Sequence, residues 1–160
     1  MNEFCTLNIA PTDLIMTVLM TPDLANFSGN VHGGNILKLL DQVAYACASR
    51  YAGSYVVTLS VDQVIFKEPI YVGELVTFLA RINYVGNTSM EVGIRVEAEN
   101  IQTRTTRHTN SCYFSMVAID DNHKPKPVPQ LELVDEIAKR RFETAKKRKE
   151  LRMQLQQNNW

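Results

Sequence analysis

Residues 88–101 carry the clearest pattern in the chain, an alternation of apolar and polar side chains. Apolar residues stand at the even positions from 90 to 98, and charged residues stand at 91, 95, 97 and 99. Because successive side chains of a strand point to opposite faces, this pattern predicts a β-strand with one buried face. The preceding Gly86–Asn87 predicts a hairpin turn, with a loop longer than two residues.

Other segments also have the periodicity of regular elements. Runs rich in β-branched and apolar residues predict strands over 12–20, 55–66, 74–85 and 104–119, with a second hairpin near Asn100–Thr103. In residues 35–52 the apolar side chains recur at helical spacing, and Gly53 is a suitable C-cap. The proline-rich segment 124–130 leads to a second expected helix over about 131–157.

The order of these elements is strand, long helix, then four consecutive strands. This order favours an α+β fold with an antiparallel sheet. The helix over 35–52 is apolar on much of its circumference, so we expect a curved sheet to wrap around it. We treat 1–130 as the main unit and 131–160 as a basic helix of the same domain.

Composition excludes several classes of protein. The chain has 160 residues, 45% of them hydrophobic, and a formal net charge of zero, so nothing draws it as a whole to nucleic acid or anionic membranes. Three widely spaced cysteines suggest neither a disulfide framework nor a metal site. No signal peptide or membrane-spanning stretch is recognisable, which predicts a cytoplasmic protein with no membrane partner. The basic excess lies in Ala138–Arg152, which is either a solvated helix or a patch for phosphates or a partner subunit.

The stretch GNVHGGNILKLLD, residues 29–41, holds the candidate chemistry. Gly33 and Gly34 stand where the long helix begins, and the first turn of a helix leaves polarised N–H groups unpaired. These groups would suit a developing oxyanion, and Asp41 would supply a general base about two turns further on. Asn30 could orient a water molecule or a carbonyl through its amide.

Each of these residues also has a purely structural explanation. Asn30 could cap the helix, the two glycines could form a turn, and Asp41 could pair with Lys38 or Tyr45 on the helix surface. His32 is more often a hydrogen-bonding loop residue than a base. The residues alone leave these alternatives open.

The motifs that the chain lacks narrow the chemistry. GxSxG, a P-loop and GxGxxG are absent, and the three histidines lack metal-ligand spacing, so we expect no metal and no separate cofactor. One carboxylate, one amide and backbone dipoles suit a thioester. Its thiol leaving group has a pKa of about 8.5 and departs as a thiolate with little help from an acid.

The motif N-x-x-G-G-x-x-L-x-x-x-D, filled by Asn30, Gly33, Gly34, Leu37 and Asp41, resembles that of the hotdog-fold acyl-coenzyme A thioesterases. The resemblance extends to TLSVDQVIFKEPIYVGE (58–74), VGNTSMEV (85–92) and KPVPQL (126–131). It is strongest to the cytosolic long-chain acyl-CoA hydrolases of brain type and their single-domain bacterial relatives. It implies a hotdog fold, an antiparallel sheet wrapped around a long central helix, here with a C-terminal helix added.

The resemblance also implies an assembly and a site. Homodimers, commonly grouped as trimers of dimers, would hold acyl-CoA at the dimer interface, with Asp41 as catalytic carboxylate and Asn30 contributed by the opposing subunit. CoA, as part of substrate and product, would lie near Thr58–Asp62 and the Asn87–Ser89 turn. The expected binding residues are His32, Thr58, Ser60, Val61, Asp62, Asn87, Thr88 and Ser89, with Lys67, Arg95, Arg104 or Arg107 for the phosphates.

The prediction is therefore an acyl-CoA thioesterase that uses Asp41 as general base and the Gly33 and Gly34 amides as oxyanion hole. The alternative role for Asp41 is that of a nucleophile, which would form a mixed anhydride with the acyl group. Two rivals remain open. A non-catalytic acyl-CoA sensor on the same fold would bind without turnover. A hydratase or dehydratase acting on acyl thioesters would depend on His32 instead of Asp41.

Overall fold

The computed structural model describes residues 10–158, and the elements follow the expected order. Each of the predicted strands and both helices is present, and one short 3-10 helix is added. The elements are β1 (Asp13–Leu19), η1 (Pro22–Leu24), α1 (Gly33–Ala52), β2 (Val56–Val61), β3 (Leu75–Val85), β4 (Ser89–Asn100), β5 (Thr105–Ala118) and α2 (Glu136–Asn158).

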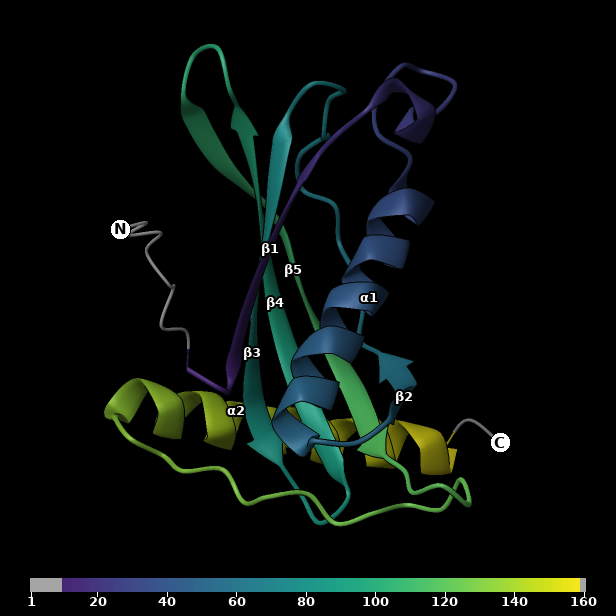
Figure 1. The fold of residues 1–160 in the computed structure, drawn as a ribbon, viewed down its shortest axis with the longest axis vertical. Helices are drawn as coiled ribbons and strands as arrows, with labels where there is room; N and C mark the ends of the chain where they lie inside the picture. The colour runs from purple at the N-terminus through teal and green to yellow at the C-terminus, as the bar shows by residue number, and fades with distance from the viewer. Residues whose placement is uncertain (1–9, 159–160) are drawn as a thin grey trace, which may run out of the picture.

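The five strands form one antiparallel sheet in the order β1-β3-β4-β5-β2. Helix α1 runs along one face of this sheet, and α2 lies crosswise to the strands (Figure 1). Strands β1 and β2 are the two edges. The strand that follows α1 in the chain is therefore an edge strand, with one side open for pairing.

The core lies between α1 and the sheet and confirms the alternation along β4. All the apolar side chains at even positions 90 to 98 are buried, and they pack with Ile36, Leu40 and Val43 of α1. Cys47 of α1 and Cys112 of β5 belong to the same core as free thiols. Burial raises the pKa of each of these two thiols to about 12.

Both hairpins were predicted correctly, but two helix boundaries and one strand boundary were not. Helix α1 begins two residues earlier than expected, at Gly33, and α2 begins at Glu136, later than the predicted 131. The late start of α2 has a local cause, because the Asp135 carboxylate accepts a hydrogen bond from the Ala138 N–H at 2.7 Å and so caps the first turn. Strand β2 ends at Val61 instead of 66, and its register shifts between Thr58 and Ser60.

The outer face of the sheet, on the side away from α1, is covered in part by α2. Glu91 of β4 was assigned to the polar face from its position in the sequence, yet it is only 1% exposed. Arg148 of α2 donates to its carboxylate at 2.6 Å and lies over the Tyr113 ring at 3.6 Å. This buried ion pair fixes α2 on the sheet.

No helix within residues 10–158 is long and apolar enough to cross a membrane. The same residues contain no group of three or more His, Cys, Asp and Glu side chains arranged to hold a metal ion.

Candidate active site

The N-terminus of α1 is capped by His32. Its Nδ1 accepts a hydrogen bond from the Gly34 N–H at 2.9 Å, and its backbone is extended, as is usual for an N-cap. The capping role considered for Asn30 therefore belongs to His32. A Cβ at residue 34 would come within 3.1 Å of the imidazole, and one at residue 33 would contact the Phe66 ring at 3.6 Å. The glycine pair thus leaves room for the capping ring and for Phe66.

This cap changes which backbone amide is available to a ligand. The Gly34 N–H is already bound to His32. For the Gly33 N–H, the described part of the chain provides no acceptor, as expected for the first residue of a helix. Of the two donors predicted for an oxyanion, only that of Gly33 is free in this arrangement.

The loop before α1 is organised by the side chain of Asn26, which the sequence analysis did not consider. Its Oδ1 accepts hydrogen bonds from the Ser28 N–H at 2.9 Å, the Ser28 hydroxyl at 2.7 Å and the Asn30 N–H at 3.1 Å. Gly29 completes the turn at a φ of +83°. Two of the donors are backbone amides, so they identify the oxygen and leave the NH₂ group of Asn26 on the other side. That NH₂ group has no acceptor among residues 10–158.

Asp41 is exposed on the flank of α1 and faces the edge strand. The Thr58 hydroxyl of β2 donates to its Oδ1 at 2.7 Å. Neither of the pairings considered earlier, with Lys38 or with Tyr45, is present among the described residues. Asp41 and Thr58 line a hollow of about 340 Å³, together with Gln42, Tyr45, Tyr55, Val56 and Val57. The carboxylate is thus oriented by one neutral donor and has no cationic partner in the described chain.

In one chain, Asp41 and the loop that contains Asn26 lie far apart along the axis of α1. Asp41 lies eight positions after Gly33, which is about 12 Å along a helix axis. The loop before α1 lies beyond the start of the helix (Figure 1). One small carbonyl group cannot contact both the loop and the carboxylate of the same chain.

The residues expected to bind CoA divide between the two faces of the sheet. Thr58 contacts Asp41 on the α1 side, whereas Ser60, beyond the bulge, lines a small hollow under α2 that Ser89 also lines. Asp62 is engaged by Arg152 of α2 at 2.7 Å. The structure therefore brings Ser60 and Ser89 together but separates them from Thr58.

The remaining expected CoA contacts lie at exposed or backbone-bound positions. Val61 is half exposed at the end of β2. The carbonyl oxygens of Asn87 and Thr88 accept hydrogen bonds from the backbone of Val128 and Ala118. The turn that contains Asn87 is thereby held against the segment that precedes α2.

Two of the four cationic side chains proposed to bind the CoA phosphates form ion pairs with glutamates. Arg107 donates to Glu74 at 2.9 Å, and Arg95 donates to Glu97 at 2.7 Å. Burial alone would raise the pKa of Glu74, but the hydrogen bonds from Arg107 and the Tyr71 N–H outweigh it and hold that pKa below its ordinary value. Lys67 and Arg104 are exposed.

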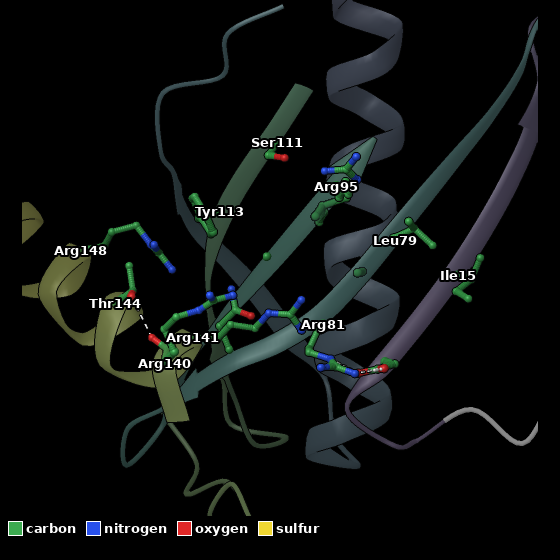
Figure 2. Close-up of a pocket in the computed structure, with 15 residues that line it drawn as sticks. Ile15, Leu79, Arg81, Arg95, Ser111, Tyr113, Arg140, Arg141, Thr144 and Arg148 are labelled. Carbon is green, nitrogen blue, oxygen red and sulfur yellow. Dashed lines mark hydrogen bonds and ion pairs between the residues drawn. The ribbon is translucent and has the colours of Figure 1, made fainter. Parts of the chain in front are cut away.

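A larger hollow on the outer face gathers arginines that the sequence analysis did not bring together. Figure 2 shows Arg81 and Arg95 from the sheet near Arg140, Arg141 and Arg148 from α2. The hollow has a volume of about 470 Å³, and its residues are not those around Asp41. The basic segment 138–152 already indicated the arginines of α2, but only the packing of α2 on the sheet brings them to Arg81 and Arg95.

Comparison with known proteins identifies the family to which the chain belongs. Residues 28–105 match the model of a family described as the thioesterase superfamily. The protein VdlD of Helicobacter pylori is 58% identical over 141 residues, which is 88% of this chain and 80% of VdlD. A hexameric acyl-CoA thioesterase solved in its apo form is 40% identical, with a TM-score of 0.85 over 89% of this chain and 91% of that one. The chain belongs to the thioesterase superfamily, and within it to the acyl-CoA thioesterases.

Two further relatives show the range of this family. The acyl-CoA hydrolase of Staphylococcus aureus, solved with butyryl-CoA, CoA and CoA disulfide, is 29% identical to this thioesterase, with a TM-score of 0.80 over 91% of this chain and 92% of that one. The mouse cytosolic acyl-CoA thioester hydrolase is 36% identical over 132 residues, which is 81% of this chain but 35% of the mouse protein. The thioesterase thus spans about a third of the length of that relative. Its hotdog fold, predicted from the resemblance, is confirmed.

Proposed function

We propose that this chain hydrolyses acyl-CoA thioesters to a free acid and CoA, with Asp41 activating the attacking water. The observation that supports this most directly is the state of the Asp41 carboxylate. It borders an open hollow, is oriented by the Thr58 hydroxyl at 2.7 Å, and has no cationic partner within residues 10–158. A carboxylate held in this way can accept a proton from water as the oxygen attacks the thioester carbon.

The reaction needs no separate acid. Attack of water on the carbonyl carbon gives an oxyanion, and its collapse breaks the carbon–sulfur bond and releases the thiolate of CoA. The proton taken up by Asp41 can then pass to this thiolate. The Gly33 N–H, contributed by the subunit that also supplies the loop before α1, is the first donor to the oxyanion, and the Gly34 N–H joins it only where His32 releases it.

A second copy of the chain would complete each site. Asp41 and the loop before α1 are separated by more than about 12 Å in one chain, so the loop that meets Asp41 must come from a partner. The open edge of β2 is suited to pairing with a second copy, because backbone N–H and C=O groups along it have no partner strand in the sheet. The exposed apolar side chains of Tyr55, Val57, Leu59 and Val61 lie on or beside this strand and would be covered by the pairing. Phe27, fully exposed beside Asn26, would be covered in such a dimer. Solved relatives described as hexameric support further assembly.

We assign the partner's amide to Asn26 in preference to Asn30. Variants of the Staphylococcus aureus hydrolase in which an Asp, an Asn or a Thr is replaced by Ala have been characterised. In that protein the Asn lies 15 residues before the Asp, and the Thr lies 17 residues after it. Here Asn26 and Thr58 stand at those separations from Asp41, whereas Asn30 lies 11 residues before it. The unpaired NH₂ group of Asn26 is also suited to donate to a thioester carbonyl.

The experiment that tests the activity measures release of the CoA thiol from a panel of short- to long-chain acyl-CoAs by the purified protein. We expect turnover, abolished in Asp41→Ala. Binding of acyl-CoA without release would overturn the proposal and favour a sensor. The expected cytoplasmic location remains a prediction.

A second experiment tests the division of the site between subunits. We expect Asn26→Ala and Asp41→Ala each to be inactive alone. When the two variants are unfolded and refolded together, random pairing should restore about a quarter of the parent activity, because half of the dimers would hold one intact site. No restoration would mean that both residues act within one chain. Asn30→Ala in place of Asn26→Ala is the matched control for the choice between the two amides.

A further inference from the structure

We propose that the ion pair between Glu74 and Arg107 positions the loop that each subunit contributes to its partner's active site. This inference rests on the proposed function, in which that loop supplies Asn26 and the Gly33 N–H. Glu74 and Arg107 would act through the backbone that they hold, and are therefore positioning residues of the reaction.

The loop before α1 is fastened near its end to segment 69–74, which leads into β3. The Val31 N–H donates to the Ile70 carbonyl oxygen at 2.8 Å. Asn30 forms an isolated antiparallel bridge with Tyr71. These contacts lie directly before the helix N-terminus that would face the oxyanion. The place of the loop therefore depends on where segment 69–74 is held.

Segment 69–74 is held in turn by the carboxylate of Glu74 and the guanidinium of Arg107. Glu74 is 5% exposed, and its carboxylate accepts hydrogen bonds from the Tyr71 N–H and from Arg107, each at 2.9 Å. Arg107, near the start of β5, also donates to the Pro69 carbonyl oxygen, and its guanidinium lies 5.3 Å from the centre of the Tyr71 ring. One arginine of the sheet thus binds the segment at three residues.

The form of this ion pair is suited to holding a backbone in one place. Arg107 donates to both oxygens of the Glu74 carboxylate, and a bidentate pair of this kind fixes the orientation of its two partners. A buried pair contributes little to stability in comparison with apolar side chains of similar volume, so its value lies in the geometry that it fixes. Precise placement matters in an active site, since a displacement of about 1 Å can lower a rate about 100-fold.

The first test measures kcat and KM for Arg107→Gln with acyl-CoA and with the matching acyl-pantetheine, which carries the same thioester but no phosphate. For both substrates we expect kcat to fall by a factor of about 10 to 10², with little change in KM. Arg107→Lys keeps the charge and should recover part of the rate. Arg81→Gln is the matched control and should keep the parent kcat. Arg81, in the second half of β3, also binds a carboxylate through two nitrogens, that of Asp13.

The second test determines which subunit the ion pair serves. Chains with Arg107→Gln are refolded with a large excess of Asp41→Ala chains. Each intact Asp41 then meets a loop whose ion pair is intact, so the rate per intact Asp41 should return to that of the parent. Parent chains refolded with a large excess of Asp41→Ala/Arg107→Gln chains should instead fall to the rate of Arg107→Gln alone. A general loss of stability would give neither result, because it would remain with the Arg107→Gln chain.

Three kinetic results would overturn the proposal. An unchanged kcat in Arg107→Gln would exclude the positioning role. A rise in KM for acyl-CoA that acyl-pantetheine does not show would assign Arg107 to the CoA phosphates. An equal loss of kcat in Arg81→Gln would indicate a general loss of stability.

Hydrogen exchange tests the inference without turnover. The backbone amides of Asn30 and Val31 should exchange faster in Arg107→Gln than in the parent, and at the parent rate in Arg81→Gln. Equal exchange in Arg107→Gln and the parent would overturn the inference. If the parent protein showed no turnover, the proposed function would fail, and this measurement would still decide whether the ion pair holds the loop.

Discussion

Asp41 and Glu91 are two carboxylates held on opposite sides of the same sheet, and their surroundings differ in almost every respect. Asp41 is exposed on α1 and accepts one hydrogen bond from a neutral hydroxyl. Glu91 is 1% exposed and receives hydrogen bonds from Arg148 and, at 3.3 Å, from Asn83, with Arg152 also close at 3.6 Å.

The difference separates charge that maintains the fold from charge that remains available for chemistry. Burial of Glu91 requires its arginine partners, because an unpaired charge in that place would be strongly destabilising. Asp41 needs no such compensation, since solvent reaches it. On the α2 side of the sheet, the buried carboxylate thus has its charge partners within one chain. On the α1 side, the Asp41 carboxylate is exposed to solvent, and the edge of β2 has no partner strand within residues 10–158.

Replacing Asp41 should have the largest effect and should act on catalysis alone. For Asp41→Asn we expect kcat to fall by a factor of about 10² to 10⁴, as for the loss of a general base, with an unchanged thermal midpoint. Steady-state release of CoA and thermal unfolding of the same preparation measure the two quantities. Lys38→Ala, one turn earlier on α1, is the matched control.

His32→Ala distinguishes this result from the hydratase alternative. Loss of the N-cap should lower the free energy of unfolding by about 1 kcal/mol, while turnover continues. A variant that folds but is inactive, beside an active Asp41→Asn, would reverse the assignment of the two residues.

Replacing Glu91 should lower stability, whereas replacing Asp41 should lower only the catalytic rate. For Glu91→Ala we expect the free energy of unfolding to fall by about 3 to 5 kcal/mol, because Arg148 would remain buried without its partner. Urea unfolding measures this loss. Glu97→Gln, which breaks a more exposed pair with Arg95, should change stability by less than about 1 kcal/mol. Equal effects of the two variants would mean that burial does not govern the strength of these pairs.

The Glu74–Arg107 pair extends the comparison to pH. Arg107→Gln should lower the free energy of unfolding at pH 7 by about 2 kcal/mol, since the buried Glu74 loses its charged donor. The pKa of Glu74 is depressed in the folded state, so its contribution is complete above its unfolded pKa of about 4.3 and is lost as pH falls through the folded value. The gap between parent and variant should therefore narrow in acid. A gap that stays constant from pH 7 to pH 3 would contradict this account.

Thr58 provides the finest test, because it acts on Asp41 without being the base. Thr58→Val keeps the shape of the side chain and removes the donor to Oδ1, so we expect kcat to fall about tenfold with little change in KM. Thr58→Ser should restore most of the rate. A loss of stability in place of a loss of rate would assign Thr58 to packing.

The sequence predicted the parts of this fold that depend on local periodicity. The alternation along β4 identified both faces of the strand, and the helical spacing in residues 35–52 identified the core face of α1. Periodicity could not show that α2 returns across the outer face and buries Glu91, since Arg148 lies 57 residues away in the chain.

For the candidate site too, the sequence indicated the residues of a local motif but not the contacts between residues that are distant in the chain. Asp41 and the glycine pair could be named as candidates because they belong to one short motif, and their catalytic roles stay a prediction. The Asp41–Thr58 hydrogen bond joins residues 17 positions apart across a helix and a strand, so it is visible only in three dimensions. Asn26 was not among the candidates because it lies outside that motif, and the hydrogen bonds that its oxygen accepts are visible only in the structure.

The buried cysteines have a consequence for a protein whose proposed product is itself a thiol. With pKa values of about 12, Cys47 and Cys112 remain protonated at neutral pH and are closed off from solvent. Only a thiolate attacks a disulfide. Under oxidative stress, neither Cys47 nor Cys112 would therefore form a mixed disulfide with CoA.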